Sequence, residues 1–248
     1  MKLTNSKLVK KQADLHQWYH QNSKITGADQ YRGLSEFSIV PPQKDYRFAE
    51  QLNLDFPEEC SDISLLDSML QRRSVRKFSG EPVGLSALST LLYYSHGVKN
   101  RIGSLHSRSY ASAGGRYSSE VYILVKNVEG MKPGVYHYDG VQHKLDVIHH
   151  NPVNDSFLIN EQEMGNYSFL ICIGSYFDGM TQKYGERGYR YCLFDVGQIC
   201  QNVYLLSTAL EIGCCAIGGF YDDELNRALG LDGHKESSIL VMAVGRQG

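Results

Sequence analysis

The chain has 248 residues, a formal net charge of −2 and a hydrophobic content of 42%. This is enough apolar material for one full core, and the near-neutral charge without a long basic block argues against nucleic-acid binding. No apolar run reaches the roughly 18 residues that a membrane-spanning helix needs, and Met1–Ser6 lacks the apolar core of a signal peptide. We therefore expect a cytoplasmic protein with no membrane span and no nucleic-acid partner.

The six cysteines give no sign of a metal or redox centre, because no two of them have C-x-x-C spacing. Most stand among apolar residues, so we expect reduced thiols that serve as small hydrophobic side chains, and no metal site. Seventeen tyrosines are more than usual. Their flat faces and polar tips suit cofactor walls and interfaces, and suit ordinary half-buried positions equally well.

Residues 1–60 differ from the rest of the chain. A polar helix is predicted over Ser6–His20, and prolines then interrupt a stretch of weak periodicity. This segment is too short and too polar to hold a core of its own. We predict an arm or docking extension over 1–60 and a single domain over 61–248.

Beyond residue 60, helices and strands mix without regular alternation, which favours an α+β fold over a doubly wound sheet. Gly97 and Gly213 stand where helices should end, and Asp139-Gly140 is a strong hairpin turn. The predicted elements are a helix from Ser64 into 72–76, a helix over Ser86–His96, a loop over Lys99–Ser118, a strand over Glu120–Lys126, a hairpin of Gly134–Tyr138 and Lys144–His149, a strand over Ser168–Gly174, a helix over Phe194–Ile212, a helix over Asp222–Leu229 and a strand over Ser238–Val244. The helix over Phe194–Ile212 is apolar nearly all round, which is typical of a central core helix or an interface helix.

Arginines near the end of the first of these helices form a candidate anion receptor, because guanidinium groups fork onto phosphate oxygens. The residues are Arg72, Arg73, Ser74 and Arg76. A solvated basic face that complements the helix dipole is the simpler interpretation. Arg246, two residues beyond the last strand, is a weaker candidate because terminal arginines are usually exposed.

Two stretches of small residues could approach a planar ligand closely through their backbone N–H groups. They contain Ser112, Ala113 and Gly114 in one case and Ile217, Gly218 and Gly219 in the other. The alternatives are a flexible surface loop for the first and an ordinary tight connection for the second.

Lys183 and Tyr184 open a stretch dense in titratable groups, which runs from Gln182 to Arg190. Their ordinary pKa values are about 10.4 and 10, so either would need burial or a cationic neighbour to exchange protons at neutral pH. Arg187 and Arg190 could lower the pKa of the tyrosine if they point inward. The alternative is a charged loop that caps the following helix.

The order of these segments is more specific than any one of them. Between Leu65 and Arg246, the chain reads Arg-Arg-Ser-x-Arg, Ser-Ala-Gly, Lys-Tyr-x-x-Arg-Gly-Tyr-Arg, Gly-Gln-x-x-Gln-Asn, Gly-Gly-Phe and Val-Gly-Arg. This order resembles the SagB-type dehydrogenases of the nitroreductase-like FMN superfamily, which include the oxidase subunits of thiazole/oxazole-modified peptide synthetases of the microcin B17 type. Gln21–Lys24 also resembles the family's lead-in, more weakly.

The resemblance implies an α+β sandwich with a mixed or antiparallel sheet flanked by helices, and an intertwined homodimer with FMN at the subunit interface. By the same resemblance, the FMN phosphate and ribityl chain are held by Arg72, Arg73, Ser74, Arg76 and Arg246. The flavin ring is lined by Ile217, Gly218 and Gly219, and approached from the partner subunit by Ser112, Ala113 and Gly114. Lys183 and Tyr184 match the Lys-Tyr pair assigned to catalysis in the peptide oxidases.

The chain departs from the family at the Ser-Ala-Gly loop. The family usually has proline before this motif and often Tyr-Pro after it, whereas here Ala111 and Ser118 stand at those positions. Loss of both ring constraints predicts a more flexible loop.

The function implied by the resemblance is FMN-dependent oxidation of thiazoline and oxazoline rings in a ribosomally made peptide, in company with a cyclodehydratase. Two alternatives stand beside it. One is an NAD(P)H-dependent nitroreductase or quinone reductase for small molecules, which would need the same FMN site. The other is a non-catalytic assembly subunit whose arm docks a cyclodehydratase or a leader peptide.

Overall fold

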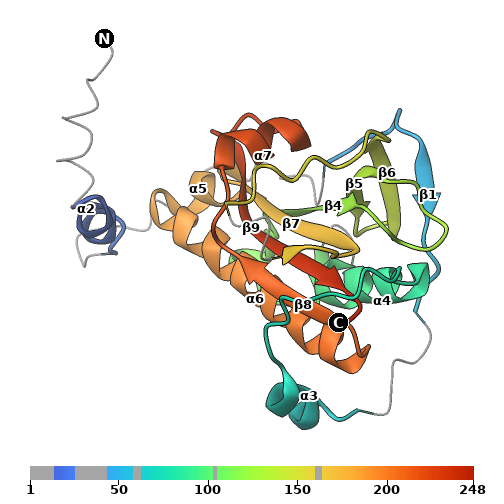
Figure 1. Ribbon diagram of the computed structural model, residues 1–248. Helices are drawn as coiled ribbons and strands as arrows, with labels where there is room; N and C mark the ends of the chain where they lie inside the picture. The colour runs from blue at the N-terminus through green and yellow to red at the C-terminus, as the bar shows by residue number, and fades with distance from the viewer. Residues whose placement is uncertain (1–13, 26–43, 58–62, 103–104, 160–163) are drawn as a thin grey trace.

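A seven-stranded antiparallel sheet runs through the centre of the chain, in the order β1-β6-β5-β4-β7-β9-β8 (Figure 1). The computed structural model describes residues 14–25, 44–57, 63–102, 105–159 and 164–248. The strands are β1 Gln51–Asn53, β2 Val98–Ile102, β3 Leu105–Arg108, β4 Ser119–Val125, β5 Gly134–Asp139, β6 Lys144–His149, β7 Phe169–Tyr176, β8 Gly213–Ile217 and β9 Glu236–Gly245. The helices are α2 Leu15–Asn22, α3 Leu65–Gln71, α4 Leu85–His96, α5 Asp178–Tyr184, α6 Arg187–Ala209 and α7 Asp222–Leu229, with a 3-10 turn η1 at Ala113–Gly115.

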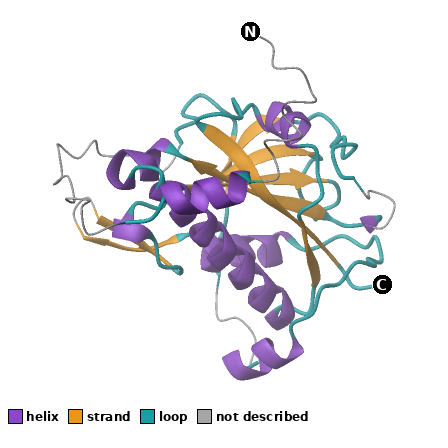
Figure 2. Cartoon of the chain, turned by 90° about the vertical axis from the view of Figure 1, so that its left-hand side faces the viewer, coloured by secondary structure: helices purple, strands orange, loops and turns teal. Residues whose placement is uncertain are grey.

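Both faces of the central strands are covered. In β4, Ile123 points into a core shared with α4 and α6, while Tyr122 and Leu124 belong to a second core shared with α7. Figure 2 shows helices lying across the sheet on the viewer's side. A strand that is buried on both faces has a continuous run of apolar residues. This explains why polar and apolar residues do not alternate in the sequence of β4. The predicted α+β fold is confirmed, and every strand pair within the main sheet is antiparallel.

The helix predicted from Ser64 begins there and ends sooner than expected. The Ser64 Oγ accepts a hydrogen bond from the Asp67 N–H at 3.1 Å, which is an N-cap. The helix stops at Gln71 because the next residues turn toward β8, where the Val75 N–H donates to the Cys214 carbonyl at 2.8 Å. The arginine segment is therefore extended chain and not part of the helix.

The long helix begins at Arg187, well before the predicted Phe194, and a separate helix α5 precedes it. Two glycines make this corner feasible. Gly185 has a φ of +57° between the helices, and a Cβ on Gly188 would lie 2.7 Å from the backbone of Met180. Glycine is a poor helix former, so the glycines weakened the prediction of a helix here. The close packing of the two helices nevertheless requires glycine at position 188.

Three short strands beyond residue 60 were not predicted. The loop expected over Lys99–Ser118 contains the hairpin of β2 and β3, and Gly213 begins the strand β8 after the helix. β8 is only five residues long and is defined by its pairing with β9. Such strands exist through tertiary contacts that a local apolar pattern does not reveal.

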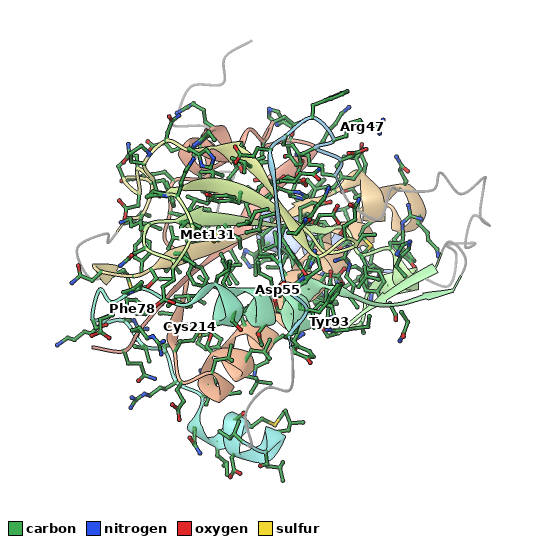
Figure 3. The ribbon with its side chains drawn as sticks, turned by 90° about the vertical axis from the view of Figure 1, so that its right-hand side faces the viewer. Arg47, Asp55, Phe78, Tyr93, Met131 and Cys214 are labelled. Carbon is green, nitrogen blue, oxygen red and sulfur yellow. The ribbon has the colours of Figure 1, made fainter. Side chains whose placement is uncertain are left out.

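The described parts of residues 1–60 lie in two different places. Part of the helix predicted over Ser6–His20 lies outside the described residues, and α2 occupies Leu15–Asn22. β1 is the edge strand of the sheet beside β6. Just after it, the Asp55 carbonyl accepts a hydrogen bond from Ser89 of α4 at 2.5 Å, and Figure 3 shows Asp55 beside this helix.

Candidate functional site

Tyr204 of α6 joins the arginine segment to β8. Its hydroxyl lies 2.9 Å from the Ser74 Oγ and accepts a hydrogen bond from the Ala216 N–H at 2.8 Å. The Arg72 guanidinium stands over the ring of the same tyrosine, 5.1 Å from its centroid. One aromatic side chain therefore holds two of the predicted phosphate ligands beside the end of β8.

Arg246 and Gln247, near the C-terminus, bond to the chain that contains the arginine segment. Arg73 donates from Nη2 to the Gln247 Oε1 at 2.9 Å, and the Ser79 N–H donates to the Arg246 carbonyl at 3.0 Å. These bonds bring Arg246 alongside the chain that follows Arg76. The backbone of Arg246 therefore lies beside the segment that carries Arg72, Arg73 and Arg76.

Ile217 is the last residue of β8, paired with Val241, and two exposed glycines follow it. A Cβ on Gly218 would meet no atom within 4 Å, so packing within this chain gives no reason for glycine there. The Gly218 backbone faces open space, two residues beyond the Ala216 N–H that bonds to Tyr204. We call this group the arginine half-site, and it contains Arg72, Arg73, Ser74, Arg76, Ile217, Gly218, Gly219 and Arg246.

The charge of the arginine half-site is not neutralised locally. None of the ion pairs between described residues includes Arg72, Arg73 or Arg76. Guanidinium groups without carboxylate partners, next to a serine hydroxyl and an open glycine backbone, form a donor set that suits a phosphate. The residues present therefore fit the phosphate end of FMN.

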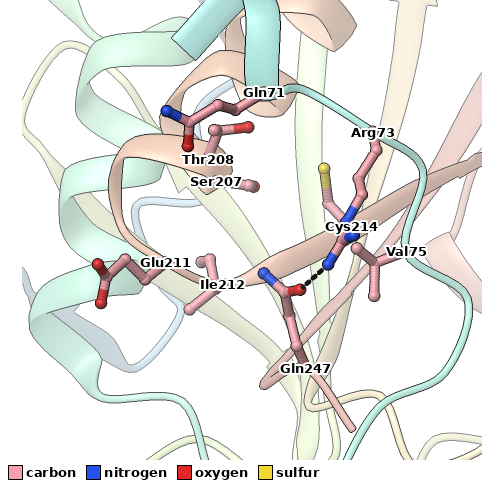
Figure 4. Close-up of a pocket in the computed structure, with 9 residues that line it drawn as sticks. All are labelled: Gln71, Arg73, Val75, Ser207, Thr208, Glu211, Ile212, Cys214 and Gln247. Atoms are coloured by element: carbon pink, nitrogen blue, oxygen red, sulfur yellow. Dashed lines mark hydrogen bonds between the residues drawn. The ribbon is translucent and has the colours of Figure 1, made fainter. Parts of the chain in front are cut away.

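A pocket of about 420 Å³ lies beside this half-site, between α3, the end of α6 and β8 (Figure 4). The Arg73–Gln247 hydrogen bond crosses one wall. The other lining residues are Gln71, Val75, Ser207, Thr208, Glu211, Ile212 and Cys214. Arg73 is the single predicted site residue on its lining, so this pocket adjoins the half-site and does not contain it.

The loop with Ser112, Ala113 and Gly114 is fastened to α6. The Ser112 Oγ lies 2.6 Å from Asp195 Oδ2 and accepts a hydrogen bond from the Tyr117 N–H at 2.9 Å. Gln198 accepts from the Ala111 N–H at 3.1 Å and donates to the Ala111 carbonyl at 2.8 Å. A proline at 111 would lack the N–H that Gln198 uses. Side-chain hydrogen bonds thus restrain the loop in which prolines are missing.

Lys183 and Tyr184, in the last turn of α5, converge on this loop. Gly114 has a φ of +62°, and a Cβ built on it would lie 2.5 Å from the Tyr184 hydroxyl and 2.7 Å from Lys183 Nζ. Both side chains are half-buried. Ser112, Ala113, Gly114, Lys183 and Tyr184 form what we call the Lys-Tyr half-site, and all five come from one chain.

The two half-sites contact α6 at different positions along its axis. Asp195 holds the Lys-Tyr half-site and Tyr204 holds the arginine half-site. Nine residues of helix separate these two anchors, which corresponds to about 14 Å along the axis. The structure therefore brings the predicted residues together as two groups and not as one.

Sequence reasoning missed the side chains that anchor the half-sites, namely Tyr204, Asp195, Gln198 and Gln247. The motif Gly-Gln-x-x-Gln-Asn does contain Gln198, but its role depends on a contact with a loop 87 residues away. Arg190 was considered as an influence on Tyr184. Its side chain instead bonds to Ser23 Oγ at 2.9 Å, on the N-terminal segment.

The described residues contain no group of three His, Cys, Asp or Glu side chains placed to hold a metal ion. No helix in the described part of the chain is long and apolar enough to cross a membrane. Five cysteines are free thiols, and Cys60 lies outside the described ranges.

A model of the Nitroreductase family matches residues 69–246. The Methanocaldococcus jannaschii protein MJ1384, which carries a nitroreductase name, is 32% identical over 201 residues, covering 80% of this chain and 98% of that protein. The microcin B17-processing protein McbC of Escherichia coli is 26% identical over 148 residues, covering 56% of this chain and 54% of McbC.

Solved structures share the fold. A structure named as a nitroreductase from Anabaena variabilis superposes with a TM-score of 0.74 and 24% identity, over 93% of this chain and 47% of that one. A chain of the E. coli microcin synthetase McbBCD complex with truncated pro-MccB17 bound gives a TM-score of 0.63 and 20% identity, over 100% and 98%. The chain thus spans about half the length of the Anabaena protein and, in the sequence alignment, of McbC. From the family match and the likeness to MJ1384, the chain belongs to the nitroreductase family of flavin oxidoreductases.

Proposed function

We propose that this protein is an FMN-dependent dehydrogenase that oxidises thiazoline and oxazoline rings in a ribosomally made peptide to thiazoles and oxazoles. The observation that carries the proposal is the convergence of Lys183 Nζ and the Tyr184 hydroxyl on Gly114. This places two proton-transfer groups beside a loop of small residues. The likeness to McbC, whose name gives its role as microcin B17 processing, supports the peptide substrate.

Conversion of an azoline to an azole removes two hydrogens from the ring, one as a proton and one as a hydride. FMN, when bound, supplies the hydride acceptor, and dioxygen is the oxidant that we expect to regenerate it. Lys183 or Tyr184 takes the proton, so the protein's task is to position the ring and provide a base. Because Gly114 has no side chain, the Lys183 and Tyr184 groups can lie this close to the loop.

The residues proposed to hold FMN divide by chemistry. Arg72, Arg73, Ser74, Arg76 and Arg246 would bind the phosphate and ribityl chain, since they offer guanidinium and hydroxyl donors. Ile217, Gly218 and Gly219 would line the flavin ring. The contacts of Arg72, Ser74 and Ala216 with Tyr204 support the assignment.

A homodimer would join the two half-sites. On one protomer they stand about 14 Å apart along α6. Phe194 on α6 is 60% exposed, and the short helix α3 exposes four apolar side chains together, Leu65, Leu66, Met69 and Leu70. Clustered exposed apolar residues of this kind mark interfaces. If two α6 helices pack antiparallel about a two-fold axis, the Lys-Tyr half-site of each protomer faces the arginine half-site of the other.

The proposal is tested with an azoline-containing peptide and mass spectrometry, which detects the loss of two hydrogens per ring. Lys183→Ala and Tyr184→Phe should keep the yellow cofactor, because neither residue belongs to the arginine half-site. The variant that removes the base should lose about 100-fold or more in turnover. Lys132→Ala, an exposed lysine on the β4–β5 connection, is the matched control. Normal oxidation by both single variants would show that the assigned roles are wrong.

A second candidate is an NAD(P)H-dependent reductase of nitro compounds or quinones, which the likeness to MJ1384 over nearly all of that protein favours. It would use the same FMN site. Rapid NAD(P)H oxidation in the presence of a nitroaromatic or a quinone, unaffected by Lys183→Ala, would select this function over the first.

We also propose association with a cyclodehydratase, which would supply the azoline. The fold shared with a chain of the McbBCD complex supports this partner. Co-purification with such an enzyme is the direct measurement. A colourless protein that cannot be reconstituted with FMN would instead indicate a non-catalytic assembly subunit.

A further inference from the structure

The C-terminal turn of α2 is hydrogen-bonded to the connection between α5 and α6 and to the first turn of α6. The Tyr19 hydroxyl donates to the Glu186 carbonyl at 3.1 Å. Arg190 Nη2 donates to the His20 carbonyl at 2.8 Å, and Arg187 Nη1 donates to the Ser23 carbonyl at 3.1 Å. Cations that bond the last carbonyls of a helix satisfy acceptors that the helix leaves open. The contact is therefore a specific attachment of α2 to the α5–α6 corner.

Ser23 is the best enclosed residue of this attachment, with 2% of its surface exposed. Its hydroxyl donates to the Tyr19 carbonyl at 2.6 Å and accepts a hydrogen bond from Arg190 Nε at 2.9 Å. α2 has only eight residues and no buried residue of its own. A helix this short is marginal in isolation, so the hydrogen bonds to the α5–α6 corner fix its place.

Arg187 connects this attachment to the Lys-Tyr half-site. While one end of its guanidinium bonds to Ser23, its Nε donates to the Tyr191 hydroxyl at 3.0 Å. The Tyr191 ring then meets the Tyr184 ring edge to face, with centroids 4.9 Å apart and planes at 85°. A continuous series of contacts thus leads from α2 to the ring whose hydroxyl points at Gly114.

We infer that residues 15–24 act as a strap that positions Tyr184. The Ser23 carbonyl holds Arg187, Arg187 holds Tyr191, and Tyr191 holds the Tyr184 ring against Gly114. This inference rests on the proposed function of the Lys-Tyr half-site. Arg187 and Tyr191 are positioning residues in this arrangement, because they act through Tyr184. The strap gives part of the N-terminal arm a role inside the enzyme, in place of docking to another protein.

The test uses the full-length, FMN-loaded protein and the azoline peptide. Arg187→Met and Tyr191→Leu should lower kcat by about tenfold to a hundredfold, since small misplacement of a reacting group has effects of this size, while KM and FMN content stay near the wild-type values. Tyr191→Phe keeps the ring and should retain more activity than Tyr191→Leu. Arg187→Lys, which keeps one donor, should recover part of the loss. His16→Ala, on the exposed side of α2, is the matched control.

Hydrogen exchange provides a measure that does not depend on turnover. Ser23→Ala removes the hydroxyl that bonds to Arg190 and to the end of α2, and Arg187→Met removes the bond to the Ser23 carbonyl. Both variants should speed amide exchange in residues 178–192 and leave β4 unchanged. Unchanged kcat and exchange in Arg187→Met would overturn the inference. Faster exchange throughout the molecule would also overturn it, since that result indicates a general loss of stability. A Ser23→Ala variant that loses only the binding of a cyclodehydratase, with normal kcat and exchange, would likewise overturn the inference.

The two proposals can fail separately. If Lys183→Ala and Tyr184→Phe oxidise the peptide normally, the proposed function of the half-site is wrong whatever the exchange data show. If those variants lose turnover but the Ser23, Arg187 and Tyr191 variants keep it, the half-site stands and the strap is wrong.

Discussion

Asp195 shows how one buried carboxyl group organises a loop. It lies on α6, and its Oδ2 accepts a hydrogen bond from the Ser112 hydroxyl. The same hydroxyl accepts a hydrogen bond from the Tyr117 N–H. Burial raises the pKa of Asp195 to about 7, although the hydrogen bond from Ser112 and the charge of Arg108 act in the opposite direction. The carboxyl group therefore changes charge near neutral pH while it holds the loop.

Asp195→Asn should remove a pH dependence of stability. In the unfolded chain the carboxyl titrates near 4, so between about pH 4 and pH 7 the folded protein binds more protons and its free energy of unfolding falls as pH rises. The asparagine side chain does not titrate, so the variant lacks this pH dependence, and it still accepts a hydrogen bond from Ser112. Between about pH 4 and pH 7, its free energy of unfolding should rise relative to that of wild type by up to about 1.4 kcal/mol per pH unit.

Urea unfolding of both proteins at pH 4.5, 6 and 8 measures the difference. Asp178→Asn, in the first turn of α5, controls for the loss of an ordinary carboxylate. Parallel pH profiles for wild type and Asp195→Asn would contradict the assignment.

At this scale the sequence indicated residue types but not their neighbours. Lys183, Tyr184 and Gly114 could be selected because reactive groups and glycines are unusual where they stand. Asp195 and Gln198 look like ordinary polar positions on a helix, and they gain their roles from contacts with residues 83 and 87 positions away in the chain. Residue spacing within a helix carries no information about such contacts.

Among the elements, β5 is tied to both of its neighbours by a buried charge. His137 has no exposed surface, and its Nε2 lies 2.8 Å from Glu120 on β4 while its Nδ1 lies 3.5 Å from Asp146 on β6. Burial alone would lower the pKa of this histidine, but the hydrogen bonds to Asp146 and Glu120 raise it above the ordinary 6.5. Below this raised pKa, a protonated imidazole links three strands.

His137→Gln should destabilise the sheet by about 3–5 kcal/mol at pH 6, because it removes the cation between two buried carboxylates. Glu120 then loses its imidazolium partner, while Asp146 keeps Lys144 Nζ at 3.5 Å. The stabilisation from His137 is complete below pH 6.5 and is lost as pH rises through the raised pKa. The difference between wild type and variant should therefore shrink toward pH 9. Urea midpoints at the two pH values test this, with the exposed His234→Gln as control. A difference that does not change with pH would mean that His137 is not protonated.

Elements with long apolar runs were predictable, and short ones were not. β4, β7 and β9 follow from their hydrophobic patterns because each buries most of its length. α7 follows from Leu225 and Leu229, which are buried and lie one helical turn apart. β8 and the β2–β3 hairpin are too short to have a pattern, and α5 and the start of α6 have glycines that weaken the helical signal. In each case the pairing strand or the packed helix decides the structure.

At the scale of the whole molecule, the separation of the half-sites leads to a subunit-mixing prediction. One variant carries Arg76→Ala and Arg246→Ala, and the other carries Lys183→Ala and Tyr184→Phe. If each active site combines the two half-sites from different protomers, a purified mixed dimer has one intact site and one that lacks both halves. It should show about half of wild-type turnover, although neither parent variant is active.

Co-expression with two different affinity tags isolates the mixed dimer, and the azoline peptide assay measures it. No recovered turnover in a folded mixed dimer would mean that each site is built within one protomer. A protein that stays monomeric in solution with full activity would contradict the dimer itself. The sequence could suggest the dimer only by resemblance, because the order of motifs along a chain does not give the distances between them.

The fastening of residues 111–117 has a kinetic consequence. A proline ring restricts the backbone at all times, whereas the two bonds between Ala111 and Gln198 can break and form again. We therefore expect this loop to open transiently, on the microsecond scale typical of loop motions, and so to admit a ring carried inside a long, bulky chain. Protection of the Ala111 amide against hydrogen exchange reports how often it does so, and protection equal to that of β4 would show that it stays shut.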